Sequence, residues 1–495
     1  MSKIKFGWAE VDITPKKGQK IGLAGQFFER ITDEVESPIS ITALTIDSGS
    51  DYVIMCACDL VSICENLNKI VKEKLAGFSM INPDKVIVSA IHTHTSYVYK
   101  REMSITKINA KDYLASIIPE DMAYKPLVTT EERMSPDVAL DFLANKIVEA
   151  VLLSWENRCH GYYRNAFGRA AVGMCRRVCY DDGSALMWGD TNTANFTELE
   201  GGNDNGIELI FTYDENKKLT GVVANIACPA QVVEHRSYIS SDYWGKVKDN
   251  LRKEYGEEIF VLGLCSAAGD QCPRDMIRWV EPESYIDDPN IKREVVLERN
   301  ADPSMFDISG LKLVGRRISS EIIAVHEELN REYIDQAELI HETANIALPL
   351  RRVTKTEYSN AVEMIDKFIE KNRGKTINFD DNAKMHVYSG IIARYELQKT
   401  VDVFPIEVHI VRLGDIAIAT NPFELFLNYG NQIRARSKAK QTFLIQLACG
   451  AYGYLPTEKA ERGSHYSAYV SSGYTGHEGG DLLVRETLAK INNLF

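Results

Sequence analysis

The chain has 495 residues, a formal net charge of −13, and 45% hydrophobic and 26% charged residues. This length allows a large buried core, and the composition is that of an ordinary globular protein. The negative charge disfavours nucleic acid and anionic membranes as partners, because both select clustered Lys and Arg. A small-molecule substrate is compatible with it, and so is a homo-oligomer.

The N-terminal segment, MSKIKFGWAEVDITP, has no apolar core and no small-residue cleavage site, so we expect no secretory signal. No apolar run approaches the roughly 18 residues of a spanning helix, which predicts no stable membrane association. The ten cysteines include no C-x-x-C pair. This pattern is typical of reduced thiols in a cytoplasmic enzyme, not of a cysteine-rich zinc site.

Apolar runs alternate with amphipathic stretches along the chain. Strands are expected at 51–60, 84–91 and 259–265, with a hairpin at 206–213 and 219–228, two strands within 407–420 and a strand at 442–449. Helices are expected at 64–74, 137–157, 310–329, 357–371 and 481–494, and a charged surface loop at 279–303. The pattern predicts an α/β fold, in which a mixed β-sheet is flanked by helices.

Polar side chains stand where the predicted strands end. Asp59, the pair His92 and His94, Asp270, Glu424 and Tyr454 each follow an apolar run. In open α/β sheets, ligands bind outside the carboxyl ends of the strands. We therefore expect a site at these ends. The sharpest signal is His92-Thr93-His94, because extended backbone points alternate side chains to one side and so lets both imidazoles reach one metal. A polar loop with one His bonded to the backbone explains the same spacing.

Several motifs occur in an order that resembles the neutral/alkaline ceramidase superfamily. They are Ala9-Glu10-Val11-Asp12-Ile13-Thr14-Pro15, Cys58-Asp59-Leu60, His92-Thr93-His94-Thr95, Ile239-Ser240-Ser241-Asp242-Tyr243-Trp244-Gly245, Ala267-Ala268-Gly269-Asp270-Gln271, Asn421-Pro422-Phe423-Glu424 and Gly453-Tyr454-Leu455-Pro456-Thr457, followed by Tyr466. The resemblance spans nearly the whole chain and implies a zinc amidase, a hydrolase of linear amides.

The resemblance also implies roles for single residues. His92, Glu424 and Tyr454 match three zinc ligands of the family. His94 matches a histidine beside the substrate carbonyl, and Tyr466 matches a tyrosine that helps to polarise it. Arg176 matches an arginine near the site, with Arg177 as a close competitor.

The sequence departs from the family at the second histidine ligand, where it reads Ala227-Cys228-Pro229-Ala230-Gln231. The nearest histidine is His235, although Cys228 or Pro229 aligns with the family ligand. Three readings stay open: His235 as the ligand, Cys228 or Gln231 as the ligand, or no fourth protein ligand. We favour His235, because an imidazole preserves the charge at the metal whereas a thiolate adds negative charge.

The family also carries a C-terminal immunoglobulin-like domain. We expect instead a single catalytic unit over residues 1–495, with an inserted helical and loop region at about 279–400 and no such domain. A soluble amide or ester then suits the enzyme better than ceramide. Zn²⁺ would activate water, His94 and Tyr466 would donate to the oxyanion, and Asp242 or Asp270 would orient a ligand or act as a base. Asp242 is equally explained as a helix N-cap.

Two other functions fit the sequence. One is a carbohydrate-active enzyme that uses the same metal site on a sugar derivative. The other is a metal-free binding protein derived from the enzyme by loss of the second histidine. Metal analysis would distinguish the metal-free protein from both enzymes. Activity on acyl amides compared with glycosides would then distinguish the two enzymes.

Overall fold

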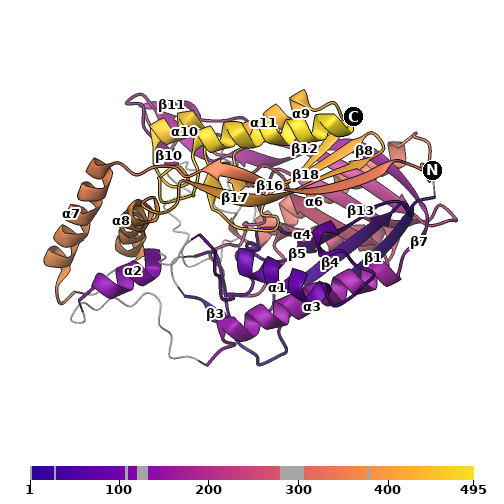
Figure 1. The fold of residues 1–495 in the computed structure, drawn as a ribbon, viewed down its shortest axis with the longest axis horizontal. Coiled ribbons are helices and arrows are strands. Elements are labelled where there is room, and N and C mark those ends of the chain that lie inside the picture. The colour runs from indigo at the N-terminus through magenta and orange to yellow at the C-terminus, as the bar shows by residue number, and fades with distance from the viewer. Residues whose placement is uncertain (1–2, 27–28, 106–109, 120–131, 279–305, 376–378) are drawn as a thin grey trace.

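The structure is a computed structural model that describes residues 3–26, 29–105, 110–119, 132–278, 306–375 and 379–495. The loop expected at 279–303 lies outside the described residues. Three larger β-sheets enclose one core, and helices cover their outer faces (Figure 1).

The first sheet has the strand order β6-β5-β4-β1-β7. Its strands are β1 (Lys5–Asp12), β4 (Ser40–Asp47), β5 (Tyr52–Cys58), β6 (Val86–Ala90) and β7 (Cys159–His160). The pair β5 and β6 is parallel, whereas the other pairs are antiparallel. Helices α1 (Glu65–Leu75) and α3 (Pro136–Glu156) pack on its outer face. Ser135 begins α3 by accepting a hydrogen bond from the Val138 N–H, which satisfies an unpaired N-terminal donor.

The second sheet has the order β14-β13-β12-β8-β15. Its strands are β8 (Tyr162–Cys175), β12 (Asp204–Tyr213), β13 (Leu219–Ile226), β14 (Phe260–Cys265) and β15 (Gln271–Cys272). The predicted hairpin is present as the antiparallel pair β12 and β13, and β13 continues parallel to β14. Helices α4 (Tyr243–Tyr255) and α6 (Ile308–Glu328) cover this sheet.

The third sheet has the order β16-β17-β18-β20. Its strands are β16 (Leu339–Pro349), β17 (Val403–Leu413), β18 (Ile416–Thr420) and β20 (Gln441–Ile445). Helices α9 (Leu427–Arg436) and α11 (His477–Leu494) cover it, and α11 runs along the upper edge of Figure 1. Two-residue strands β19 (Glu424–Leu425) and β21 (Tyr454–Leu455) pair in parallel beside it.

The inner faces of the three sheets meet in one apolar cluster. Trp8 of β1, Leu262 of β14 and Phe443 of β20 are buried members of it. The fully buried Asn225 side chain joins the second and third sheets, because its amide donates to the Leu444 carbonyl and its oxygen accepts from the Leu444 N–H. A satisfied buried amide fixes how two sheets meet, since leaving it unpaired is costly.

Helices α2 (Ala110–Ile117), α7 (Lys355–Asn372) and α8 (Phe379–Leu397) stand at one end of the molecule, at the left of Figure 1. They share a small apolar cluster of their own that includes Leu114, Ile365 and Ile392. The smaller elements are β2 (Ile21–Gly22), β3 (Ile31–Thr32), β9 (Arg177–Tyr180), β10 (Ala185–Met187), β11 (Phe196–Leu199), α10 (Glu458–Gly463) and the 3₁₀ turn Pro83–Lys85.

The predicted fold class, α/β with mixed sheets flanked by helices, is confirmed. The long strands β8 and β16 and the N-terminal pair β1 and β4 were not among the predicted elements; β16 lies within 279–400 and belongs to the third sheet. Among the described residues, no helix combines the length and apolar character needed to cross a bilayer.

Candidate metal and catalytic site

His92 lies just past the end of β6, in a left-handed backbone conformation with φ of 73°. Its backbone N–H donates to the Leu60 carbonyl, so the segment just after β5 holds it. Its Nδ1 lies 2.7 Å from the Val61 carbonyl oxygen. A carbonyl only accepts, so Nδ1 carries a proton, and Nε2 is the ring nitrogen left to bind a metal. This Nε2 lies on the side of the ring that faces His94 and Glu424.

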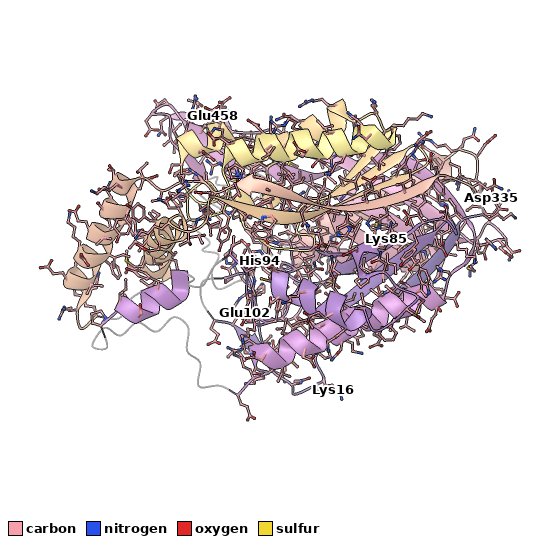
Figure 2. The ribbon with its side chains drawn as sticks, in the orientation of Figure 1. Lys16, Lys85, His94, Glu102, Asp335 and Glu458 are labelled. Carbon is pink, nitrogen blue, oxygen red and sulfur yellow. The ribbon has the colours of Figure 1, made fainter. Side chains whose placement is uncertain are left out.

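His94 brings a second imidazole to the same place. Its Nε2 lies 3.2 Å from His92 Nε2. Burial and the neighbouring His92 lower the pKa of His94 to about 3, so the ring is neutral. Figure 2 labels His94 within the body of the molecule, and its side chain is 12% exposed. Gly25, at φ +94°, makes room for it, because a Cβ there would lie 2.4 Å from His94 Cγ.

Glu424 and Tyr454 are brought together by the parallel pair β19 and β21, in which they are direct partners. Glu424 Oε2 lies 3.5 Å from His92 Nε2. Gly269 lets the chain after β14 approach this pair, because a Cβ at that position would lie 2.3 Å from the Glu424 carbonyl oxygen. Three of the four residues that the sequence predicted as metal ligands, His92, Glu424 and Tyr454, therefore meet in one region.

Tyr454, Tyr466 and Arg176 form the adjoining wall. The Tyr454 hydroxyl donates to Tyr466 Oη at 3.3 Å, and Arg176 Nη2 lies 3.4 Å from the Tyr454 hydroxyl. Burial raises the pKa of Tyr454 well above its usual value, and the nearby Glu424 adds to this. Arg176 also donates to the Gly269 carbonyl and is 3% exposed, so its guanidinium is a fixed positive charge at the site.

Arg177 points elsewhere. It makes a bidentate ion pair with Glu200 at 2.8 and 2.9 Å, and both side chains are buried. It also donates to the carbonyls of Ser464 and Tyr466. Arg177 therefore fixes the loop that carries Tyr466, while Arg176 contacts the site itself.

Glu234 is a site residue that the sequence reasoning missed. Its Oε2 lies 3.3 Å from His94 Nδ1, although the two groups are not aligned as a hydrogen bond, and its side chain is 11% exposed. Burial opposes its charge, but His235, His94 and Arg176 outweigh burial and lower its pKa to about 2. Nothing in the sequence indicated this role except that Glu234 directly precedes His235, the residue predicted as a metal ligand.

The segment after β13 carries His235, Cys228 and Gln231, the three candidates for the fourth metal ligand, and they differ in burial and in partners. His235 Nε2 lies 3.4 Å from Glu234 Oε1, its ring is 5.8 Å from Phe306, and its side chain is 38% exposed. Cys228 is fully buried, and burial raises the pKa of its thiol well above the usual value. Gln231 is fully buried, and neither polar atom of its amide has a partner among the described residues. The Ala230 N–H donates to the Ile91 carbonyl, so this segment lies beside His92.

Asp242 and Asp270 both accept backbone hydrogen bonds. Asp242 caps α4 through the Tyr243 N–H and also accepts from the Val233 N–H, so it ties α4 to the segment that carries Glu234. Asp270 accepts from the Leu427 N–H at the start of α9, and its carbonyl accepts from the Arg176 N–H. Burial raises the pKa of Asp242 to about 7 and that of Asp270 to about 6.

The donor set fits a metal ion. His92 Nε2 lies between two further donors, 3.5 Å from Glu424 Oε2 and 3.2 Å from His94 Nε2. Imidazole nitrogens and a carboxylate suit zinc and similar ions. The Arg30 guanidinium supports the frame, because it donates to the carbonyls of His94, Glu234 and Arg236 at 2.7 Å each.

Comparison with known proteins places this geometry in a known architecture. No family model matches the chain, and no curated protein matches it in sequence. The neutral ceramidase from Pseudomonas aeruginosa is similar in structure, with a TM-score of 0.67 and 14% identity over 99% of this chain and 74% of that chain. A structure described as ceramidase complexed with C2 has a TM-score of 0.65 and 13% identity over 99% and 75% of the two chains. The chain therefore has the neutral ceramidase fold, and the predicted resemblance is confirmed at the level of the fold.

Proposed function

We propose that this protein is a metal-dependent hydrolase that cleaves the amide, or ester, of a small polar substrate. The observation that carries the proposal is the position of His92 Nε2, which lies 3.2 Å from His94 Nε2 and 3.5 Å from Glu424 Oε2 inside a fold shared with neutral ceramidases. Bound zinc would supply an activated water and polarise the scissile carbonyl.

We assign His92, Glu424 and Tyr454 as ligands. His235 was the sequence-based choice for the second imidazole, but the 3.2 Å between the Nε2 atoms of His92 and His94 supports His94 in that place. Two nitrogens bound to one zinc at about 2.0–2.1 Å lie roughly 3.3 Å apart in a tetrahedral site. Glu234, beside His94 Nδ1, would then fix the orientation of the ring.

The remaining groups act on the substrate. Tyr466 can donate from its hydroxyl to a developing oxyanion, and the Arg176 guanidinium provides positive charge beside it. Asp242 and Asp270 serve as positioning residues, because their carboxylates accept backbone N–H groups at helix starts. Arg176 and Glu234 place charges at the site, which favours a polar substrate over one with a long aliphatic chain.

The test is hydrolysis of short N-acyl amides and matched esters by the full-length protein, with and without zinc. The proposal predicts zinc-dependent release of the amine, and loss of that release in Glu424→Gln. Turnover of glycosides with no turnover of amides or esters would contradict it.

A further inference from the structure

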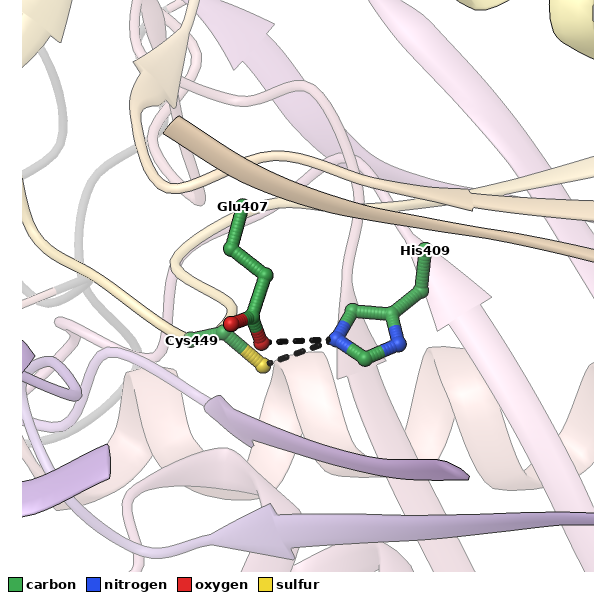
Figure 3. A group of neighbouring side chains, drawn as sticks. All are labelled: Glu407, His409 and Cys449. Carbon is green, nitrogen blue, oxygen red and sulfur yellow. Dashed lines mark hydrogen bonds and ion pairs between the residues drawn. The ribbon is translucent and has the colours of Figure 1, made fainter. Parts of the chain in front are cut away.

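A second group of metal-binding side chains lies on the third sheet. Glu407 and His409 stand two residues apart on β17 and so share a face, and Cys449 follows β20. His409 Nε2 lies 2.9 Å from Glu407 Oε1 and 3.5 Å from Cys449 Sγ, as Figure 3 shows. Within the described ranges, these are the three His, Cys, Asp or Glu side chains whose ligand atoms all lie within 4.8 Å of one another.

The surrounding hydrogen bonds fix where the protons of His409 lie. Thr343 donates its hydroxyl proton to the Asp84 carbonyl, so its oxygen can only accept from His409 Nδ1, at 3.1 Å. His341 Nδ1 faces the Tyr52 carbonyl at 3.2 Å and therefore carries a proton. With that proton on Nδ1, the Nε2 of a neutral His341 is a bare acceptor, and it lies 2.9 Å from His409 Nδ1.

Both contacts require the proton of a neutral His409 to be on Nδ1. Its Nε2 then presents a lone pair to the Glu407 carboxylate and the Cys449 sulfur, so three Lewis bases face one point. In a catalytic Cys–His–Glu triad, the thiol and the carboxylate would contact different ring nitrogens. Here both contact the same nitrogen, which is the arrangement of ligands around a cation.

We propose that Glu407, His409 and Cys449 bind a divalent transition metal of the zinc class, at a second site that shares no residue with the first. One sulfur, one nitrogen and one oxygen donor favour such an ion over Mg²⁺ or Ca²⁺, which prefer oxygen. His409 is fully buried and Cys449 is 5% exposed, which suits a structural ion. His341 and Thr343 hold the ligand ring through its other nitrogen, as outer-shell partners of metal-bound histidines do.

The site would join parts of the chain that meet only in the fold. The Cys449 N–H donates to the Val88 carbonyl of β6, and the Asn68 side chain of α1 donates to the Cys449 carbonyl. Cys449 has φ of 56°, a conformation that costs energy for a residue with a side chain. Tyr454 follows five residues later, so an ion at Cys449 would anchor the approach to the first site.

A hydrogen-bonded cluster without metal is the competing account. Lys72 Nζ lies 2.7 Å from Glu407 Oε2, and a protonated His409 with a thiol at Cys449 would also balance the charge. The two accounts differ in one measurable way, because only a metal site contains a metal–thiolate bond.

The experiment adds Co²⁺ to the full-length, chelator-treated protein and records the thiolate-to-cobalt charge-transfer band in the near ultraviolet. We expect the band in the wild-type protein and in His92→Ala, which should bind about one equivalent less metal. We expect Cys449→Ser and His409→Gln to lose it. Cys58→Ser is the matched control, since Cys58 is also fully buried and ends a neighbouring strand, and it should keep the band.

Two outcomes would overturn the proposal: no band in the wild-type protein, or a band that survives in Cys449→Ser, in which case loss of the band in Cys228→Ser would identify Cys228 as its source. Misfolding of the variants does not block the test, because X-ray absorption of the zinc-loaded wild-type protein must show a sulfur neighbour at about 2.3 Å. Absence of that sulfur would equally refute the second site. Activity of the first site is not used in either readout, so the two proposals fail independently.

Discussion

His92 and His94 bring their Nε2 atoms to 3.2 Å from each other, although His92 is held by a carbonyl on one side of the site and His94 lies against a carboxylate on the other. The spacing His-x-His predicted that both rings reach one centre. His92 is held through Nδ1, and Glu234 lies beside the Nδ1 of His94, so the two Nε2 atoms are the ones that face each other.

The choice between His94 and His235 can be decided by substitution. We expect His94→Ala to lower zinc occupancy and amide hydrolysis at least ~10-fold, the scale seen when metal-shell residues are lost. His235→Ala should change zinc content less than twofold, since its half-exposed ring lies beside Glu234 and Phe306. Metal analysis of both purified variants is the measurement. Full zinc retention in His94→Ala with loss in His235→Ala would restore the assignment made from the sequence.

Glu234 should affect chemistry more than folding. Glu234→Gln keeps the shape of the side chain but removes the negative charge beside His94 Nδ1, so we expect activity to fall ~10–100-fold. The melting temperature should change little, because the Glu234 carbonyl still accepts from Arg30. Steady-state kinetics with thermal unfolding distinguishes these effects, and unchanged kinetics would remove Glu234 from the site.

Gly25 and Gly18 provide a matched pair. Both have positive φ, +94° and +83°, but a Cβ at Gly25 would meet the His94 ring whereas nothing lies within 4 Å at Gly18. An alanine therefore costs backbone strain at both positions and displaces the catalytic ring at only one. We expect Gly25→Ala to lose at least ~10-fold in activity, since a 1 Å displacement near the chemistry is enough for this. Gly18→Ala should stay within about twofold of the wild-type activity; equal losses would mean that strain alone is responsible.

Glu10 should stabilise the folded protein at neutral pH and lose this effect in acid. Burial would raise its pKa, but Lys248 at 2.9 Å and Arg252 at 2.7 Å outweigh burial and lower it to about 2. A carboxyl with a folded-state pKa below its unfolded value stabilises the protein above the unfolded pKa, near 4.5, and loses this as pH falls toward 2. We expect Glu10→Gln to lower the free energy of unfolding by roughly 3 kcal/mol at pH 7, and the difference to shrink below about pH 4.5. Urea unfolding across this range checks the sign, and a difference that grows on acidification would contradict it.

Local patterns in the sequence predicted much of this fold. A few adjacent residues were enough to predict β5, β6, β14 and the turn between β12 and β13. The same is true of the polar groups at the strand ends. The sequence placed Glu424 and Tyr454 at a shared site, but it did not predict that they pair directly, because β19 and β21 are two-residue strands with no periodicity.

Glu234 could not be predicted in this way. Asp242 accepts from Val233, and Arg30, 204 residues before Glu234 in the chain, binds the carbonyls of the same loop, so tertiary contacts place Glu234 beside His94. Asp59 shows the converse. It ends a predicted strand like the site residues, yet it accepts from the Ser40 N–H and lies 4.0 Å from Lys248. A strand end thus identifies candidates, and tertiary contacts select among them.

The most direct test of the account is the metal dependence of amide hydrolysis in wild-type protein and Glu424→Gln. Chelator-treated wild-type protein should lose release of the amine from a short N-acyl amide and regain it on addition of zinc. Glu424→Gln should bind less zinc and show no such recovery, because it replaces the carboxylate 3.5 Å from His92 Nε2. Undiminished hydrolysis by the chelator-treated protein, or full zinc-restored activity in Glu424→Gln, would contradict the account.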